Sequence, residues 1–185
     1  MEALRQGFAV QFLWGAALTL ALSVASVLVG SALGLLAAAA KLWGGRALGL
    51  LAEAYTTIVR GVPDLLVIFV IYFGGTVTLS RLLGQPVNLD PFTAGVAALG
   101  FVFGAYATEI FRGAILGAAR GQVEAGRALG LAPRQVFRHV TLPQAWRLAL
   151  PPFGNQALIL TKQTSLVSVV GLEEIMRKAQ VGAGF

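Results

Sequence analysis

Apolar and polar positions divide this chain into long uncharged runs separated by short polar segments. The first run begins at Gln6 and continues for 35 residues without a Lys, Arg, Asp or Glu. A helix that crosses a membrane needs about 20 mostly apolar residues. We expect the chain to form one all-α, polytopic helix bundle in a membrane, a single domain over residues 1–185. The pattern predicts four membrane-spanning helices, at about residues 10–40, 63–80, 92–115 and 145–170.

The polar segments between the apolar runs also predict local structure. Residues 41–60 contain a short helix whose apolar face is interrupted by Glu53, which suits a helix at the membrane interface. Pro63 separates this segment from the next span, because the residue before a proline avoids the helical region and proline itself can begin a helix. The fourth span contains Pro151 and Pro152, so we expect it to start or to be kinked there.

The segment at 121–144 is polar and contains regularly placed glycines and prolines. It begins with a short helix at 122–129, and Gly130 lies just past its end, where glycine adopts a left-handed conformation at little cost. Pro133 opens a second helical turn, and we expect Leu142-Pro143 to end that turn before the next span. The sequence therefore predicts two short helical legs joined at a glycine.

Composition agrees with a membrane protein and excludes several kinds of site. The chain is 57% hydrophobic and 12% charged, whereas soluble domains carry about 25% charged residues. It has no cysteine, which excludes disulfides, thiolate metal sites and a cysteine nucleophile. Its one histidine, His139, lies among arginines without further metal ligands nearby in sequence. We therefore expect neither catalytic residues nor a metal site.

The basic residues are clustered in a way that indicates membrane topology rather than nucleic-acid binding. Six of the 14 Lys and Arg residues fall between Arg112 and Arg147, where Glu124 is the only acidic residue. In the four-span arrangement these arginines share one side of the membrane with the segment at 41–60. The positive-inside rule places that side in the cytoplasm and the N-terminus outside.

Small residues recur at intervals of four, a spacing that lets helices in lipid pack backbone against backbone. Because glycine is abundant here, we interpret the spacing only as evidence for a close-packed bundle. The rows are Ser26/Gly30/Gly34, Gly100/Gly104 and Gly113/Gly117/Gly121.

The cytoplasmic segment at 121–144 has two physical interpretations. Its first helix combines small and apolar residues with arginines, as in a helix that docks in a groove of another protein. A helix that rests on anionic lipid headgroups would have the same composition. Physical reasoning on the residues alone does not separate these two interpretations.

A resemblance to a known family favours the first interpretation. The segment resembles the "EAA" loop of bacterial ABC-transporter permease subunits, although its third motif position is Gly126 where alanine is usual. The similarity extends from about Phe12 to the end of the chain and is closest to the polar amino-acid uptake branch. The loop residues that match are Glu124, Ala125, Gly126, Ala128, Leu129, Gly130, Leu142 and Pro143. Further matching motifs are 60–63 (RGVP), 106–113 (YATEIFRG), 154–156 (GNQ) and 162–166 (KQTSL).

The resemblance implies a fold, partners and a location. It implies a type I ABC-importer permease in the bacterial inner membrane, whose loop docks in a cleft of a cytoplasmic ATPase. The implied partners are two ATPase subunits, a second permease subunit (identical or homologous) and an extracytoplasmic amino-acid-binding protein, besides membrane lipid. ATP would be held by the ATPase subunits, since this chain has no G-x-x-x-x-G-K-[ST] phosphate loop. The family usually has a fifth span after about residue 180, which this sequence lacks.

Charged and hydroxyl side chains near the predicted spans are candidates for the substrate path. The residues of these motifs look most like those of permeases for histidine, lysine, arginine and ornithine, or for opines. We therefore expect a polar, basic amino acid as the substrate. Ionisable residues inside a membrane are costly and often functional. Glu109 could bind a cationic side chain or merely pair with Arg112 at i,i+3. The candidates are Glu109, Lys162, Thr164, Ser165 and Asp64.

Three other functions are alternatives to the transport of a basic amino acid. A permease of the same type for a neutral or acidic amino acid is the nearest alternative. A membrane-embedded enzyme would need paired catalytic groups or a metal cluster within the bilayer, and a channel would need rings of charge or carbonyl groups along a pore. The sequence shows neither pattern, so a transporter remains the favoured hypothesis.

Overall fold

The computed structural model describes residues 2–86, 88–172, 175–176 and 178, and helices account for nearly all of this part of the chain. No strand occurs within the described residues. The elements are α1 (Glu2–Trp43), α2 (Gly45–Gly61), α3 (Asp64–Phe69), the π-helical turn η1 (Val70–Gly74), α4 (Gly75–Leu83), α5 (Pro91–Leu116), α6 (Arg120–Ala128), α7 (Pro133–Val136), the π-helical turn η2 (Phe137–Thr141), α8 (Leu142–Gln163) and the 3-10 helix η3 (Thr164–Val170).

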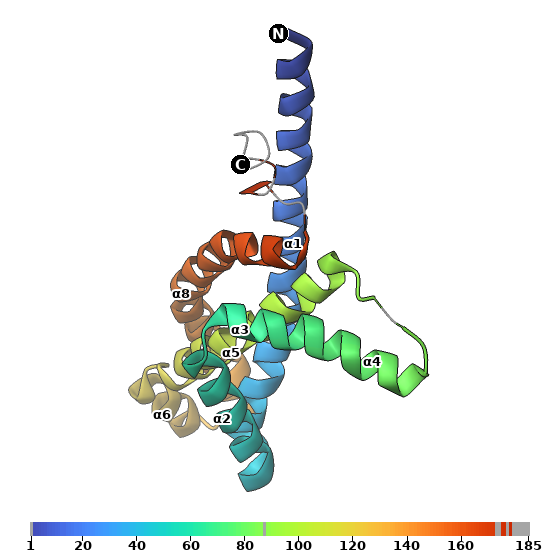
Figure 1. Cartoon of the computed structure of the whole chain (residues 1–185). Helices are drawn as coiled ribbons and strands as arrows, with labels where there is room; N and C mark the ends of the chain where they lie inside the picture. Colours follow the sequence, from blue (N-terminus) through green and yellow to red (C-terminus); the bar gives the residue numbers. More distant parts are fainter. Residues whose placement is uncertain (1, 87, 173–174, 177, 179–185) are drawn as a thin grey trace.

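The long helices α1 and α5 form the centre of the bundle (Figure 1). They approach closely because two of the predicted rows of small residues face each other. A Cβ atom added at Gly30 would lie 2.6 Å from the carbonyl oxygen of Gly100, and one added at Gly34 would lie 2.7 Å from the Cβ of Ala107. Glycine is therefore required at this crossing. The third row differs, since a Cβ at Gly113 would meet nothing within 4 Å.

The main apolar core lies where α1, α3, α5, α8 and η3 meet. Leu22, Ile68, Phe103, Leu160 and Val167 are its most deeply buried large side chains, one from each of these elements. Phe103 packs edge-to-face on Phe153, which extends the core along α8. The arm formed by α3, η1 and α4 leaves this core and points away from α1 (Figure 1).

Three described helical stretches are long and apolar enough to cross a membrane: Val10–Trp43, Asp64–Leu83 and Pro91–Leu116. They agree with the first three predicted spans. The fourth predicted span coincides with α8 and η3, but polar residues such as Asn155 and Lys162 keep α8 from reaching the hydropathy of the other three. Its crossing of the membrane stays a prediction.

The prolines of the fourth predicted span lie inside a helix rather than at its start. The prediction that Leu142-Pro143 ends a helical turn is wrong, because α7, η2 and α8 follow one another without a break and Leu142 has helical angles (φ −62°, ψ −43°). A π-helical turn just before Pro143 changes the backbone hydrogen-bonding pattern, so the helix continues through a residue that has no N–H group to donate. Pro151 and Pro152 also lie within α8, so the span does not start there.

The helix α2 packs against the bundle through one of its faces, and its predicted position at the membrane interface stays a prediction. Its residues Ala52, Thr56 and Val59 are buried. The hydroxyl of Tyr55 donates to the carbonyl of Phe101 at 2.6 Å, and the two aromatic rings are in contact. Burial raises the pKa of Tyr55, because it disfavours the charged phenolate. These contacts attach α2 to the middle of α5.

Candidate functional site

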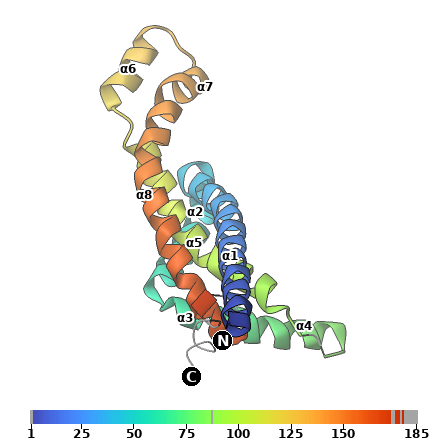
Figure 2. The same ribbon diagram turned by 90° about the horizontal axis from the view of Figure 1, so that it is seen from above.

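The predicted two-legged segment is present and projects beyond the rest of the bundle (Figure 2). Its first leg, α6, ends in a Schellman motif, in which the N–H of Leu131 donates to Gly126 and the N–H of Gly130 donates to Arg127. Gly130 has φ +82°, which confirms the predicted left-handed conformation. We call residues 119–144 the coupling loop, after the role that the resemblance implies for the predicted segment at 121–144, and its shape follows from this one turn.

The motif residues of the coupling loop divide into an inner and an outer set. Gly126 is buried against the second leg, where an added Cβ would lie 3.5 Å from Val136 and 3.6 Å from Val140. Leu129, by contrast, is 83% exposed. The other motif residues Glu124, Ala125, Ala128, Gly130, Leu142 and Pro143 are also exposed. The loop thus presents most of the motif at its surface and uses Gly126 to hold its two legs together.

Gly126→Ala is expected to be neutral or stabilising, by up to about 1 kcal/mol, because the added methyl would make ordinary contacts and alanine is the better helix former. Thermal unfolding of the purified protein measures this. A clear loss of stability would show that the two legs lie closer together than this structure has them.

The base of the coupling loop is closed by Gln144. Its side-chain oxygen accepts from the N–H of Ala119 at 3.1 Å, and its side-chain nitrogen donates to the carbonyl of Val140 at 2.8 Å. Within the loop, the side-chain oxygen of Gln135 accepts from the N–H of Ala132 at 2.8 Å and caps the second leg. Both glutamines therefore satisfy backbone groups that the helix termini leave without partners.

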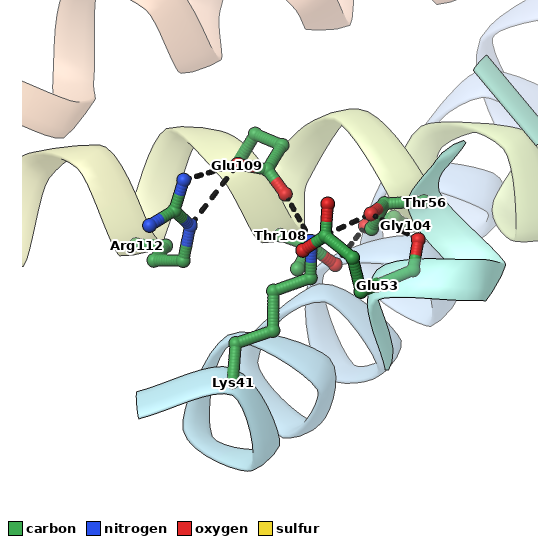
Figure 3. A network of polar contacts seen from close by, with 7 residues as sticks. All are labelled: Lys41, Glu53, Thr56, Gly104, Thr108, Glu109 and Arg112. Carbon is green, nitrogen blue, oxygen red and sulfur yellow. Dashed lines mark hydrogen bonds and ion pairs between the residues drawn. The ribbon is translucent and has the colours of Figure 1, made fainter. Parts of the chain in front are cut away.

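A buried ammonium group joins three helices at the end of α1 that faces the coupling loop (Figure 3). The Nζ atom of Lys41 lies 2.7 Å from Glu53 of α2, 2.6 Å from Thr56 of α2 and 2.5 Å from Glu109 of α5. The second carboxylate oxygen of Glu109 lies 3.1 Å from Arg112. The Lys41 side chain is only 4% exposed. All three of its donors have acceptors, which is the condition for burying such a charge without a large penalty.

This cluster bears on the candidate role of Glu109. The predicted pair with Arg112 is confirmed, and Lys41 adds a second cation that sequence reasoning did not anticipate. Both carboxylate oxygens are engaged, so a cationic ligand would have to displace one of these partners. In the sequence, Lys41 is only one of the basic residues of the segment at 41–60, whose charge indicates membrane topology. Nothing near Lys41 in the sequence indicates that Glu109, 68 residues later, is its partner.

Asp64 is placed with the other substrate-path candidates. It accepts a hydrogen bond from Gln163, which lies between Lys162 and Thr164 in sequence. Thr164 is buried and donates to the carbonyl of Thr161, whereas Ser165 donates to the carbonyl of Lys162. The structure therefore brings Asp64 to the end of α8 that contains Lys162, Thr164 and Ser165, and it places Glu109 in the separate Lys41 cluster.

The side chains of Asp64 and Lys162 have no ionic partner within the described chain. Arg60, four residues before Asp64, does not pair with it but lies over the ring of Tyr106 at 5.4 Å. Lys162 is exposed. One carboxylate and one ammonium group are thus available near the same end of α8.

A polar cavity of about 530 Å³ lies between α2, α5 and α8. Arg60, Tyr106 and Glu109 line it from one side, and Asn155 and Gln156 line it from α8. Asn155 and Gln156 belong to the GNQ motif, but their place in a cavity could not be inferred from sequence. Among the described residues, no three His, Asp or Glu side chains are grouped so that they could hold a metal ion.

The fold defines a class of protein: a membrane helix bundle with a projecting loop of two short helices. The chain matches the family described as "Binding-protein-dependent transport system inner membrane component" over residues 30–184, and it belongs to this family of inner-membrane ABC-transporter permeases. The predicted resemblance is thereby confirmed. The class is that of a transport component and not of an enzyme.

Similar proteins give a more particular picture. The histidine/lysine/arginine/ornithine transport system permease protein HisQ of Escherichia coli (strain K12) is 42% identical over 180 residues, covering 95% of this chain and 78% of HisQ. The octopine transport system permease protein OccQ of Agrobacterium tumefaciens (strain Ach5) is 47% identical over 137 residues, covering 71% of this chain and 58% of OccQ.

Solved structures support the fold. A crystal structure of an amino acid ABC transporter with histidines contains a chain with 33% identity and a TM-score of 0.85, covering 96% of this chain and 79% of that one. A chain of the inward-facing MetNI methionine ABC transporter shares the fold with a TM-score of 0.69 at 22% identity, covering 95% of this chain and 81% of that one. The predicted type I importer fold is confirmed.

Proposed function

We propose that this chain is the permease subunit of an ATP-driven importer for basic amino acids, and that Asp64 meets the cationic side chain of the substrate. Its similarity to permeases described as transporting histidine, lysine, arginine, ornithine and octopine supports the substrate class. The observation that carries the proposal is the hydrogen bond between Asp64 and the neutral Gln163, which leaves the carboxylate without a cation. A carboxylate that lies in the membrane without a cation beside it is suited to bind a positively charged group.

The surroundings of Asp64 suit an amino acid as a whole. Lys162, one residue from Gln163, offers an ammonium group without an ionic partner for the α-carboxylate of a substrate. Glu109 is less suited to bind a cation, because Lys41 and Arg112 already occupy its two oxygens. A basic amino acid bound here would find a partner for its side-chain charge at Asp64 and for its α-carboxylate at Lys162.

Asp64→Asn is expected to weaken uptake of arginine while affecting a neutral amino acid much less. A charge-assisted contact contributes about 1.5–3 kcal/mol, so the apparent affinity should fall by about one to two decades. The measurement is uptake of radiolabelled arginine and of a neutral amino acid into proteoliposomes that contain the complete transporter and its binding protein.

Glu109→Gln is the matched comparison, since it also removes one carboxylate charge. We expect it to reduce uptake of both substrates together and to lower the yield of folded protein, because it leaves Lys41 buried with one ionic partner fewer. A selective loss of arginine uptake in Glu109→Gln, with none in Asp64→Asn, would move the substrate site to Glu109. Equal wild-type uptake of neutral and basic amino acids would instead support a broader or neutral substrate range.

We further propose that the coupling loop docks on a separate ATPase subunit and that transport proceeds by alternating access around a site within the bundle. The proposed assembly contains two ATPase subunits, a second permease chain and an extracytoplasmic binding protein. The exposed motif residues and the projecting shape of the coupling loop support the docking. ATP would be bound only by the ATPase subunits.

We infer the orientation of the chain in the membrane from the uneven distribution of its basic residues. The coupling loop then lies in the cytoplasm and the N-terminus lies outside. In this cysteine-free chain, a single cysteine at Gln85 should react with an impermeant thiol reagent added to intact cells, whereas one at Arg134 should not. Both positions are exposed, so accessibility of the side chain does not confound the comparison. Labelling of the cysteine at 134 alone would reverse the proposed orientation.

A further inference from the structure

The turn between α1 and α2 contacts the coupling loop, although neither helix is next to that loop in sequence. The ring of Trp43, the last residue of α1, meets the ring of Phe137 edge-to-face, with centroids 5.6 Å apart and planes at 88°. This is a favourable geometry for an aromatic pair. Phe137 is the first residue of η2, the π-helical turn that joins the second leg of the loop to α8.

The turn that contains Trp43 is tightly built. The N–H of Gly44 donates to the carbonyl of Ala40 at 2.9 Å, and a Cβ atom added at Gly44 would lie 2.6 Å from that carbonyl oxygen. Gly45 has φ +71°, a conformation that favours glycine. The path of the backbone directly after Trp43 is therefore tightly defined.

The same turn is fixed to two other helices by Lys41, two residues before Trp43. Its ammonium group contacts Glu53 and Thr56 on α2 and Glu109 on α5 (Figure 3). The side chain is buried, so its contacts are little weakened by solvent. A displacement of Trp43 would thus move the adjoining ends of α1, α2 and α5 together instead of being absorbed within the turn.

We propose that Trp43 is a positioning residue for energy coupling: through Phe137 it transmits movement of the coupling loop to the α1–α2 turn, and Lys41 passes that movement to α2 and α5. The inference rests on the proposed function, because it presumes an importer driven by a docked ATPase. The contact between Trp43 and Phe137 adds a second route by which movement of the coupling loop reaches the bundle. The direct route is through α5 and α8, which precede and follow the loop in sequence. Trp43 is 62% exposed, so its side chain is not required to fill a core.

The test compares substrate-stimulated ATP hydrolysis by the complete transporter in nanodiscs for several variants of this chain. Trp43→Leu and Phe137→Leu should each lower the stimulation about five- to tenfold, at the low end of typical coupling between sites. The double variant should be no worse than either single one, because both break the same contact. Trp43→Phe retains an aromatic ring and should restore most of the stimulation.

Trp14→Leu is the matched control. Trp14 lies on the same helix, is 72% exposed and makes no ring contact within the described chain. A tryptophan can also serve as an anchor at the membrane interface. If Trp43 were only such an anchor, Phe137→Leu would leave the stimulation intact.

A spectroscopic measurement separates transmission from a merely structural contact. In a chain with Trp14→Phe and Trp146→Phe, Trp43 is the only tryptophan. In a complex whose partner chains also lack tryptophan, its emission should change when a non-hydrolysable ATP analogue binds, and Phe137→Leu should abolish that change. The inference is overturned if Trp43→Leu retains normal stimulation, if Phe137→Leu does so, or if the emission is unresponsive. Failure of the wild-type complex to transport any amino acid would instead overturn the proposed function.

Discussion

Gly30→Val is expected to destabilise the helix bundle strongly. A Cβ atom at this position would lie 2.6 Å from the carbonyl oxygen of Gly100, 2.8 Å from the ring of Phe103 and 3.0 Å from the amide nitrogen of Gly104. Two of these three neighbours are backbone atoms, which cannot rotate away as a side chain can. Relief requires α1 and α5 to separate, and α5 provides many of the buried residues of the core.

We expect this substitution to destabilise the protein by about 3 kcal/mol, the upper end of the usual cost of overpacking. The measurement is the yield and apparent melting temperature of a fluorescent fusion in detergent. Gly113→Val on α5 is the control, because its added side chain begins in open space. Similar losses in both variants would mean that valine in a helix, and not the crossing of α1 and α5, is responsible.

Gly130→Val is expected to uncouple ATP hydrolysis from the substrate while leaving the membrane bundle folded. Gly130 has φ +82°, which costs a β-branched residue about 1–2 kcal/mol. The chain would relieve that strain by opening the Schellman motif, which moves α6 relative to the second leg. We expect stimulation of hydrolysis to fall at least about tenfold, within the usual range of coupling between sites.

Gly121→Val is the matched control for this second prediction. Gly121 belongs to the same loop, has an ordinary helical backbone and would place its added Cβ in open space. Gln135→Ala would be a poor control, because Gln135 caps the second leg. Normal stimulation in Gly130→Val would show that the left-handed turn is not needed for docking.

Features that depend on short stretches of sequence could be predicted well. The three most apolar spans follow from continuous runs of apolar residues. The left-handed Gly130 and the pair between Glu109 and Arg112 follow from residues within one or two helical turns of each other. The spacing of small residues indicated a close-packed bundle, but it did not identify α1 and α5 as the pair of helices that approach closely. Spacing identifies rows of small residues, but it does not reveal which row faces which.

Contacts between distant segments could not be predicted in this way. Lys41 meets Glu109 68 residues later, and Gln163 meets Asp64 from 99 residues away. Such partners depend on how the helices are arranged, and periodicity within one helix contains no information about that. The expected break at Leu142-Pro143 was wrong because the preference of proline for helix starts was outweighed by a π-helical turn that continues the helix.

The Lys41 cluster also has a consequence for the order in which the chain can enter the membrane. Glu53 follows Lys41 within the next helix, but Glu109 belongs to a helix that is synthesised much later. An ammonium group is costly to transfer from water to lipid without its partners. Until α5 has been synthesised, the Lys41 ammonium group therefore has only its partners on α2, and its burial is complete only after α5 has packed against α1. Completion of the bundle is thus tied to synthesis of its central helix.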